Sequence, residues 1–122
     1  VEQGWYEGDV PGLLGALGSE LFRARRLVAD TGLHTKNWTR QQAIDYGMGV
    51  QETERYIVWP GQANAYMIGM LRILELRQKA QTELGDKFSL PAFHDLVLGA
   101  GSVPLDVLGN LVDNWIAGQK KA

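Results

Sequence analysis

Residues 54–77, ERYIVWPGQANAYMIGMLRILELR, decide how this chain is organised. Apolar side chains recur through them at steps of three and four, the spacing of a helix with one buried face. Pro60 stops a preceding helix, because proline disfavours the helical conformation of the residue before it. Proline is accepted in the first turn of a new helix, where its missing N–H is no loss. The stretch therefore predicts a short helix over residues 52–58 and a long helix from about Pro60 to about Leu84.

Two further helices are predicted upstream of this stretch. Residues 12–31 carry one apolar stripe at helical spacing, formed by Leu14, Leu17, Leu21, Ala24 and Val28. Gly32 is expected to end this helix, because glycine adopts the left-handed cap conformation without strain. Thr39 and Gln42 have the spacing of a capping box, which opens the second helix. The pair of glycines at 47 and 49 is expected to break it.

Two more helices are predicted downstream, after Gly85 ends the long one. Ser89 and Pro91 open the first of them, and Ser102 and Pro104 open the last. The buried face of the last helix is predicted to consist of Leu105, Leu108, Leu111, Val112, Trp115 and Ile116. No segment alternates in the way of a strand. The prediction is therefore an all-α fold of about six helices, forming a single helical domain over residues 1–122.

The composition excludes several classes of function. None of the 122 residues is cysteine, which rules out disulfides, thiolate metal sites and cysteine nucleophiles. The net charge of −2 argues against a general binder of nucleic acid or anionic membranes. No apolar run approaches the roughly 20 residues of a membrane-spanning helix. The N-terminal residues lack the features of a signal peptide, and because the chain starts with Val rather than Met it is expected to be a fragment.

One face of the predicted long helix carries an unusual set of side chains. Gln62, Tyr66, Gly69 and Ile73 are spaced by four, three and four residues, so they share that face. A glycine inside a helix lowers the stability of that helix by about 1 kcal/mol relative to alanine. Its presence at position 69 therefore indicates that another helix or a ligand approaches the backbone closely there. The residues alone leave two interpretations open. Tyr66 either packs across a helix crossing or takes part in chemistry.

A charged ladder lies on the first predicted helix, away from its leucines. Glu20, Arg23, Arg26 and Asp30 follow at steps of three, three and four. Such a ladder usually forms a solvated face. Asp30 and His34 also flank the predicted helix end, where they could orient a loop or contact a substrate. His34 and His94 lie too far apart in the sequence to be a strong metal signal.

Residues 39–57, TRQQAIDYGMGVQETERYI, resemble a helix-turn-helix with a glycine turn. Its second helix would carry two acidic residues, Glu52 and Glu54, and one basic residue, Arg55. The resulting net negative charge is unfavourable for a helix that lies beside phosphates. DNA binding is therefore the least favoured interpretation. The chain also lacks a Gly-rich phosphate loop, a serine nucleophile elbow and a His-Glu-x-x-His zinc motif.

Three phrases together resemble a known bacterial family. They are LFRARRLVADTGLHTKNWTRQQAIDY, ERYIVWPGQANAYMIGMLRILELR and AFHDLVLGAGSVPLDVL. The chain is similar over nearly its whole length to the C-terminal part of the family catalogued as domain of unknown function 885. That family is itself related to glutamate-zincin metallopeptidases, including thimet-oligopeptidase-like and thermostable-carboxypeptidase-like enzymes.

The resemblance implies that zinc is bound outside this chain. The family's zinc motif lies upstream, and a third ligand is expected in a Glu-Gly-Trp phrase. Residues 1–5 read VEQGW, in which Gln3 interrupts that phrase after Glu2. Residues 4–6, Gly-Trp-Tyr, match a later segment of the family instead. No metal ligand is therefore predicted within residues 1–122.

The resemblance gives Tyr66 a catalytic role. In thimet-oligopeptidase-like enzymes a tyrosine five residues after a glycine donates a hydrogen bond to the oxyanion, and Gly61 and Tyr66 have this spacing. Those relatives have a histidine three residues before the glycine, where this chain has Val58. Gln62 is predicted to bind the substrate backbone. Three residues of the first helix and its end are predicted to form a wall or bind a substrate carboxylate, namely Arg26, Asp30 and His34.

Three functions follow as hypotheses. The first is the substrate-side helical lobe of a zinc-dependent peptidase, inactive in isolation, with a peptide substrate and the rest of the same protein as partners. The second is a non-catalytic binding or scaffold module, and the third is the DNA-binding interpretation. The resemblance is compatible with a periplasmic or secreted location, because leaders are common in the family. An isolated lobe is expected to self-associate through the stripe around Tyr66.

Overall fold

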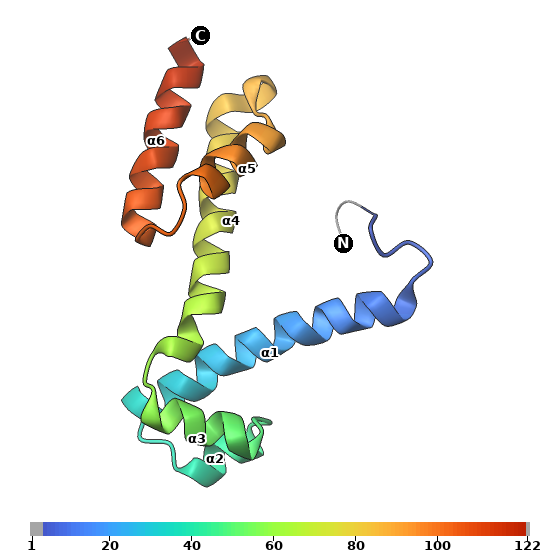
Figure 1. The fold of residues 1–122 in the computed structure, drawn as a ribbon, viewed down its shortest axis with the longest axis vertical. Helices are drawn as coiled ribbons and strands as arrows, with labels where there is room; N and C mark the ends of the chain where they lie inside the picture. Colours follow the sequence, from blue (N-terminus) through green and yellow to red (C-terminus); the bar gives the residue numbers. More distant parts are fainter. Residues whose placement is uncertain (1–3, 122) are drawn as a thin grey trace. The chain divides into compact units, whose positions relative to one another are not determined.

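The computed structural model describes residues 4–121, so Glu2 and Gln3 of the interrupted zinc phrase lie outside the described residues. Six α-helices and two short 3₁₀ helices account for the regular structure of this part, which contains no strand (Figure 1). The all-α fold with six helices is confirmed. In chain order the elements are α1 (Val10–Thr35), α2 (Arg40–Asp45), α3 (Val50–Val58), η1 (Gln62–Asn64), α4 (Ala65–Leu84), η2 (Gly85–Lys87), α5 (Leu90–Gly99) and α6 (Leu105–Lys121).

The chain forms two compact units that divide between Ile68 and Gly69. The first unit comprises α1, α2, α3, η1 and the beginning of α4. The second comprises the rest of α4 with η2, α5 and α6.

Helix α1 is longer than the sequence predicts. It begins after Asp9, whose carboxylate accepts a hydrogen bond from the Gly12 N–H at 2.9 Å. It then continues through Gly32 to Thr35, so the prediction that Gly32 ends the helix is wrong. Gly32 is buried against the indole of Trp38, and its carbonyl accepts hydrogen bonds from the backbone N–H groups of Lys36 and Trp38. Glycine is needed here for the close approach of a ring and not for a left-handed cap.

This packing predicts opposite effects for two alanine substitutions in α1. A Cβ atom at Gly32 would overlap the Trp38 ring, so Gly32→Ala should lower the free energy of unfolding by about 1–3 kcal/mol. A Cβ atom at Gly18 would meet nothing within 4 Å, so Gly18→Ala should raise it by up to about 1 kcal/mol through helix propensity alone. Urea unfolding of both variants measures the two effects. If Gly32→Ala were as stable as Gly18→Ala, the ring would not pack as described.

Helix α1 buries part of its charged ladder in place of its apolar stripe. The leucines of the stripe are exposed, with Leu14 at 70%, Leu17 at 48% and Leu21 at 51% of their full accessible surface. From the charged ladder, Arg26 and Asp30 are instead buried, at 7% and 1%. Helical periodicity locates an apolar stripe but not the element that covers it. The C-terminal half of α1 packs its polar face on α3 and η1 (Figure 1).

Helices α2 and α3 follow the local signals closely. The capping box of Thr39 and Gln42 is present in both directions, and Gly47 takes a φ of 104° in the turn before α3. The core of the unit contains Ala29, Met48, Tyr56 and Ala63, with Leu33 packed beside them.

The link from α3 to α4 departs from the prediction that the long helix starts at about Pro60. Gly61 has a φ of 81° and a ψ of −20°, which are the angles of the third residue of a type II turn. Pro60 therefore occupies a turn, a 3₁₀ helix follows at Gln62–Asn64, and α4 begins only at Ala65. Proline favours the same φ in a turn and in a first helical turn, and the glycine after it is the signal that distinguishes the two.

The second unit has its own apolar core, built from α4, α5 and α6. Its buried members are Leu76, Ala80, Leu84, Phe93, Leu108, Val112 and Ile116. Leu111 and Trp115 are half-buried, so the predicted inner face of α6 is confirmed. Ser89 caps α5 by accepting the Ala92 N–H, also as predicted. Two ion pairs tie α4 to α6, Lys79 with Asp113 at 2.6 Å and Lys120 with Glu83 at 2.7 Å.

Candidate active site

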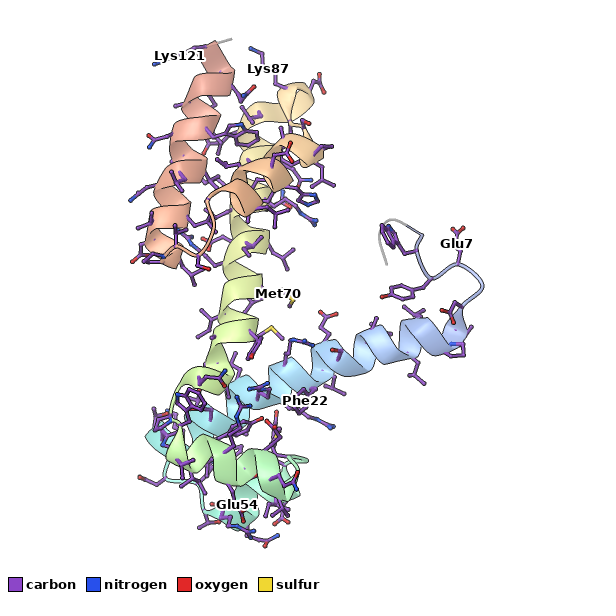
Figure 2. The ribbon with its side chains drawn as sticks, in the orientation of Figure 1. Glu7, Phe22, Glu54, Met70, Lys87 and Lys121 are labelled. Atoms are coloured by element: carbon purple, nitrogen blue, oxygen red, sulfur yellow. The ribbon has the colours of Figure 1, made fainter. Side chains whose placement is uncertain are left out.

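Arg26 is the buried centre of the candidate site. Its guanidinium lies 4.6 Å from the ring centroid of Tyr66, 5.6 Å from that of Tyr56 and 5.5 Å from that of Phe22, which is labelled in Figure 2. Aromatic faces attract cations, and the attraction grows when water is excluded. This explains how a charged side chain that the sequence pattern places in solvent is only 7% exposed.

The amide of Gln62 joins two arginines to Tyr66. Its Oε1 accepts hydrogen bonds from Arg26 Nη2 and Arg55 Nη2, each at 3.2 Å. A guanidinium can only donate, so these two bonds fix which end of the amide faces the arginines. The Nε2 of Gln62 consequently faces Tyr66 and donates to its hydroxyl oxygen at 3.4 Å.

Tyr66 is held from its ring and from its oxygen, yet it stays accessible. Two guanidinium groups lie over the ring, with Arg26 at 4.6 Å and Arg23 at 5.9 Å from its centroid, and 44% of the residue is exposed. Because the hydroxyl oxygen accepts from Gln62, its own hydrogen is not used in that bond. The phenol can therefore donate to a further acceptor.

Asp30 anchors the turn that carries these groups. Both of its carboxylate oxygens lie 3.1 Å from the backbone nitrogen of Gly61, whose N–H they share. Gly61 directly precedes Gln62, so the bond fixes the start of η1 against α1. Asp30 is thus a buried anchor, and the structure places it 1% exposed, away from solvent.

Tyr56 and Glu52 close the inner side of the cluster. Tyr56 is 1% exposed, and burial, followed by the neighbouring carboxylate of Glu52, raises the pKa of its phenol far above the ordinary value. Arg26 and Arg55 act against this shift. Tyr56 therefore stays neutral at physiological pH, and its ring serves as a packing surface for Arg26.

His34 is brought to the same unit but performs a structural task. Its Nε2 lies 2.9 Å from the backbone carbonyl of Tyr56, which can only accept, so the ring donates from Nε2. This bond supports the C-terminal end of α3. The predicted role of His34 in substrate binding stays a prediction.

The stripe predicted on the long helix is divided between the two units. Gly69 and Ile73 belong to the second unit, where Ile73 packs against the apolar core. A Cβ atom at Gly69 would meet no described atom within 4 Å. Gln62 and Tyr66 belong to the first unit, where they contribute to the cluster around Arg26.

The pair α2 and α3 forms two short helices with a glycine turn, as the helix-turn-helix interpretation requires. Its cations are already paired, however. Arg40 contacts Glu54, labelled in Figure 2, at 2.7 Å, and Arg55 contacts Glu52 at 3.8 Å. Absence of DNA binding stays a prediction.

The sequence pattern did not predict three contacts of the cluster. These are the ring contact of Arg23 with Tyr66, the hydrogen bond from Arg55 to Gln62, and the ring contact of Tyr56 with Arg26. Arg55 lies seven residues before Gln62 with the Pro60-Gly61 turn between them, and no local spacing rule covers such a pair. The one sequence signal for such contacts is the presence of arginines near several aromatic residues, and this signal is weak.

Residues 4–121 contain neither a metal-binding cluster nor a membrane span. None of them forms a group of three or more His, Asp or Glu side chains able to hold a metal ion. No helix among them is long and apolar enough to span a membrane.

Comparison with known proteins identifies the family. The family model described as "Bacterial protein of unknown function (DUF885)" matches residues 1–112. The chain belongs to this family. The resemblance noted in the sequence is thereby confirmed at the level of DUF885, whereas the further relation to zinc peptidases stays a prediction.

The chain is also similar to solved structures. One of them is described as "The crystal structure of the putative lipoprotein from Colwellia psychrerythraea" and matches with a TM-score of 0.91 and 54% sequence identity. The match covers 96% of this chain and 22% of that chain, so this chain spans about a fifth of the length of its relative. A search of the curated proteins found no match.

Proposed function

We propose that this DUF885 chain is the substrate-side helical lobe of a zinc-dependent peptidase and is inactive in isolation. The observation that carries the proposal is Tyr66, which is 44% exposed and whose hydroxyl accepts from Gln62, so that the hydroxyl hydrogen is left to donate to another group. A neutral phenol that can donate to a developing negative charge is suited to the oxyanion of peptide hydrolysis. The spacing from Gly61 to Tyr66, which the sequence shares with thimet-oligopeptidase-like enzymes, points to the same role.

The other residues of the cluster would position this donor. Arg26 and Gln62 hold the ring and the oxygen of Tyr66 from two sides. In the proposal Gln62 also contacts the peptide backbone of the substrate, and Arg26 forms part of the wall. Asp30 would act through Gly61, by fixing the turn from which Gln62 starts.

The residues that the structure describes, 4–121, do not fit a zinc ion. The described residues offer no cluster of metal ligands, and His34 already bonds a backbone carbonyl. In the proposal the ion belongs to a part of the longer protein outside this chain, in keeping with the 22% coverage of the similar solved chain. The description of that solved structure reads "the putative lipoprotein", which supports an extracytoplasmic location.

Peptide hydrolysis by the longer protein tests the proposal. We expect turnover that a chelator abolishes and that added zinc restores, and no turnover by residues 1–122 with or without zinc. The assay is release of amine from a mixture of unrelated peptides. A longer protein that hydrolyses no peptide would refute the peptidase function, and zinc-dependent turnover by the isolated chain would refute the placement of the metal.

A further inference from the structure

The exposed face of α1 is a continuous apolar seam. Val10, Leu14, Leu17, Leu21 and Val28 follow at steps of four, three, four and seven, and each is between 40% and 72% exposed. Ala24 fills the missing step between Leu21 and Val28. Steps of alternately three and four are the heptad spacing with which one helix packs along another. Large apolar side chains in one such line also exceed the scattered exposure of ordinary surfaces.

The seam leads into a hollow at the C-terminal end of α1. The hollow has a volume of about 300 Å³ and is lined by Leu27, Val28, Thr31, Gly32, Lys36 and Trp38. Trp38 forms its wall because it packs on Gly32. The hollow could receive one large apolar side chain from a helix lying along the seam.

The rest of the first unit contacts this face at its C-terminal end, where Trp38 packs on Gly32, four residues after Val28. Arg26 and Asp30, which α1 also buries in its own unit, lie on the side of the helix opposite Leu21 and Val28. Removing the seam leucines should therefore leave the packing of that unit intact. Arg25 and Lys36, both exposed, make one flank of the seam basic.

We infer that the α1 seam docks an amphipathic helix from the remainder of the longer DUF885 polypeptide. This rests on the part of the proposed function that makes the chain a lobe of a longer protein. The length argues for this occupant, since the match covers 22% of a chain that is 54% identical, and most of that chain therefore lies outside the matched part, where it can supply such a helix. The docking helix carries apolar residues at steps of three and four and acidic residues facing Arg25 and Lys36.

The double substitution Leu17→Gln, Leu21→Gln tests the inference in two contexts, the longer protein and the isolated 122-residue chain. We expect the melting temperature of the longer protein to fall by roughly 5 °C or more, because two buried leucines are lost, and that of the isolated chain to stay within about 1 °C. Amide hydrogen exchange of residues 14–28 should be slower in the longer protein than in the isolated chain. Leu98→Gln, at a residue that is 78% exposed on α5, is the matched control.

Each other outcome would overturn the inference. An unchanged melting temperature of the longer protein would mean that nothing covers the seam. An equal fall in both contexts would mean that the leucines are packed within this chain. An isolated chain that is a tight dimer at micromolar concentration, and that the double substitution makes monomeric, would identify a second copy as the occupant. None of these readouts depends on peptide hydrolysis, so failure here and failure of the proposed function are distinguishable.

Discussion

Replacing Tyr66 by phenylalanine in the longer protein is expected to lower kcat by roughly 10²–10³-fold and to change KM far less. The reason is that the substitution removes one hydrogen-bond donor that acts on charge present only in the transition state. The ring would keep its contacts with Arg23 and Arg26, because both guanidinium groups lie over its face. Steady-state kinetics on the peptide that the longer protein cleaves best measures the effect.

Stability separates this result from simple loss of packing. The Tyr66 hydroxyl accepts one long hydrogen bond, from Gln62 at 3.4 Å, and the residue is 44% exposed. Tyr66→Phe should therefore cost no more than about 1 kcal/mol in the free energy of unfolding. Tyr46→Phe is the matched control, since Tyr46 is 41% exposed and contacts Trp38 through its ring. An intact kcat in Tyr66→Phe, or an equal loss in Tyr46→Phe, would contradict the catalytic role.

The elements of this fold were largely predictable because their ends are local features. The Thr39–Gln42 capping box and the Ser89 cap are each completed within three residues, so sequence spacing suffices to find them. The inner face of α6 was predictable for a related reason. The apolar residues of α6 recur at helical spacing, and they pack in a single apolar core.

The faces of α1 show what local reasoning could not supply. The helix carries an apolar stripe and a charged ladder, and the usual assignment buries the first and exposes the second. The structure buries Arg26 and Asp30 because, apart from Phe22, the partners described above come from residues 56–66, thirty or more positions away along the chain. Such long-range compensation of a charge leaves no mark at the spacing of one helix.

The candidate site was predictable in its members and not in its connections. Gln62, Tyr66, Arg26 and Asp30 were all chosen from the sequence and all lie in one cluster. Their roles differ from one another, however. Asp30 supports the backbone at Gly61, while Tyr66 and Gln62 remain the groups through which a substrate could be contacted. The distinction depends on burial, which the sequence pattern assigned incorrectly on α1.

Asp30→Ala is expected to have the largest effect on stability, lowering the free energy of unfolding by roughly 2–4 kcal/mol. It removes a charge-assisted hydrogen bond in which both carboxylate oxygens face the Gly61 N–H, and it leaves the buried Arg26 without the negative charge one helical turn away. Chemical denaturation of the isolated chain measures the loss.

Two companion variants show whether the anchoring bond is the cause. Asp30→Asn keeps an oxygen that can accept from Gly61 but loses the charge, so it should fall between the wild type and Asp30→Ala. Glu20→Ala removes an exposed carboxylate from the same helix and should change the free energy of unfolding by less than about 0.5 kcal/mol. In the longer protein, Asp30→Ala should also reduce kcat, because a released Gly61 turn no longer holds Gln62 and Tyr66 in register. If Asp30→Ala were as stable as Glu20→Ala, the carboxylate of Asp30 would not hold the turn.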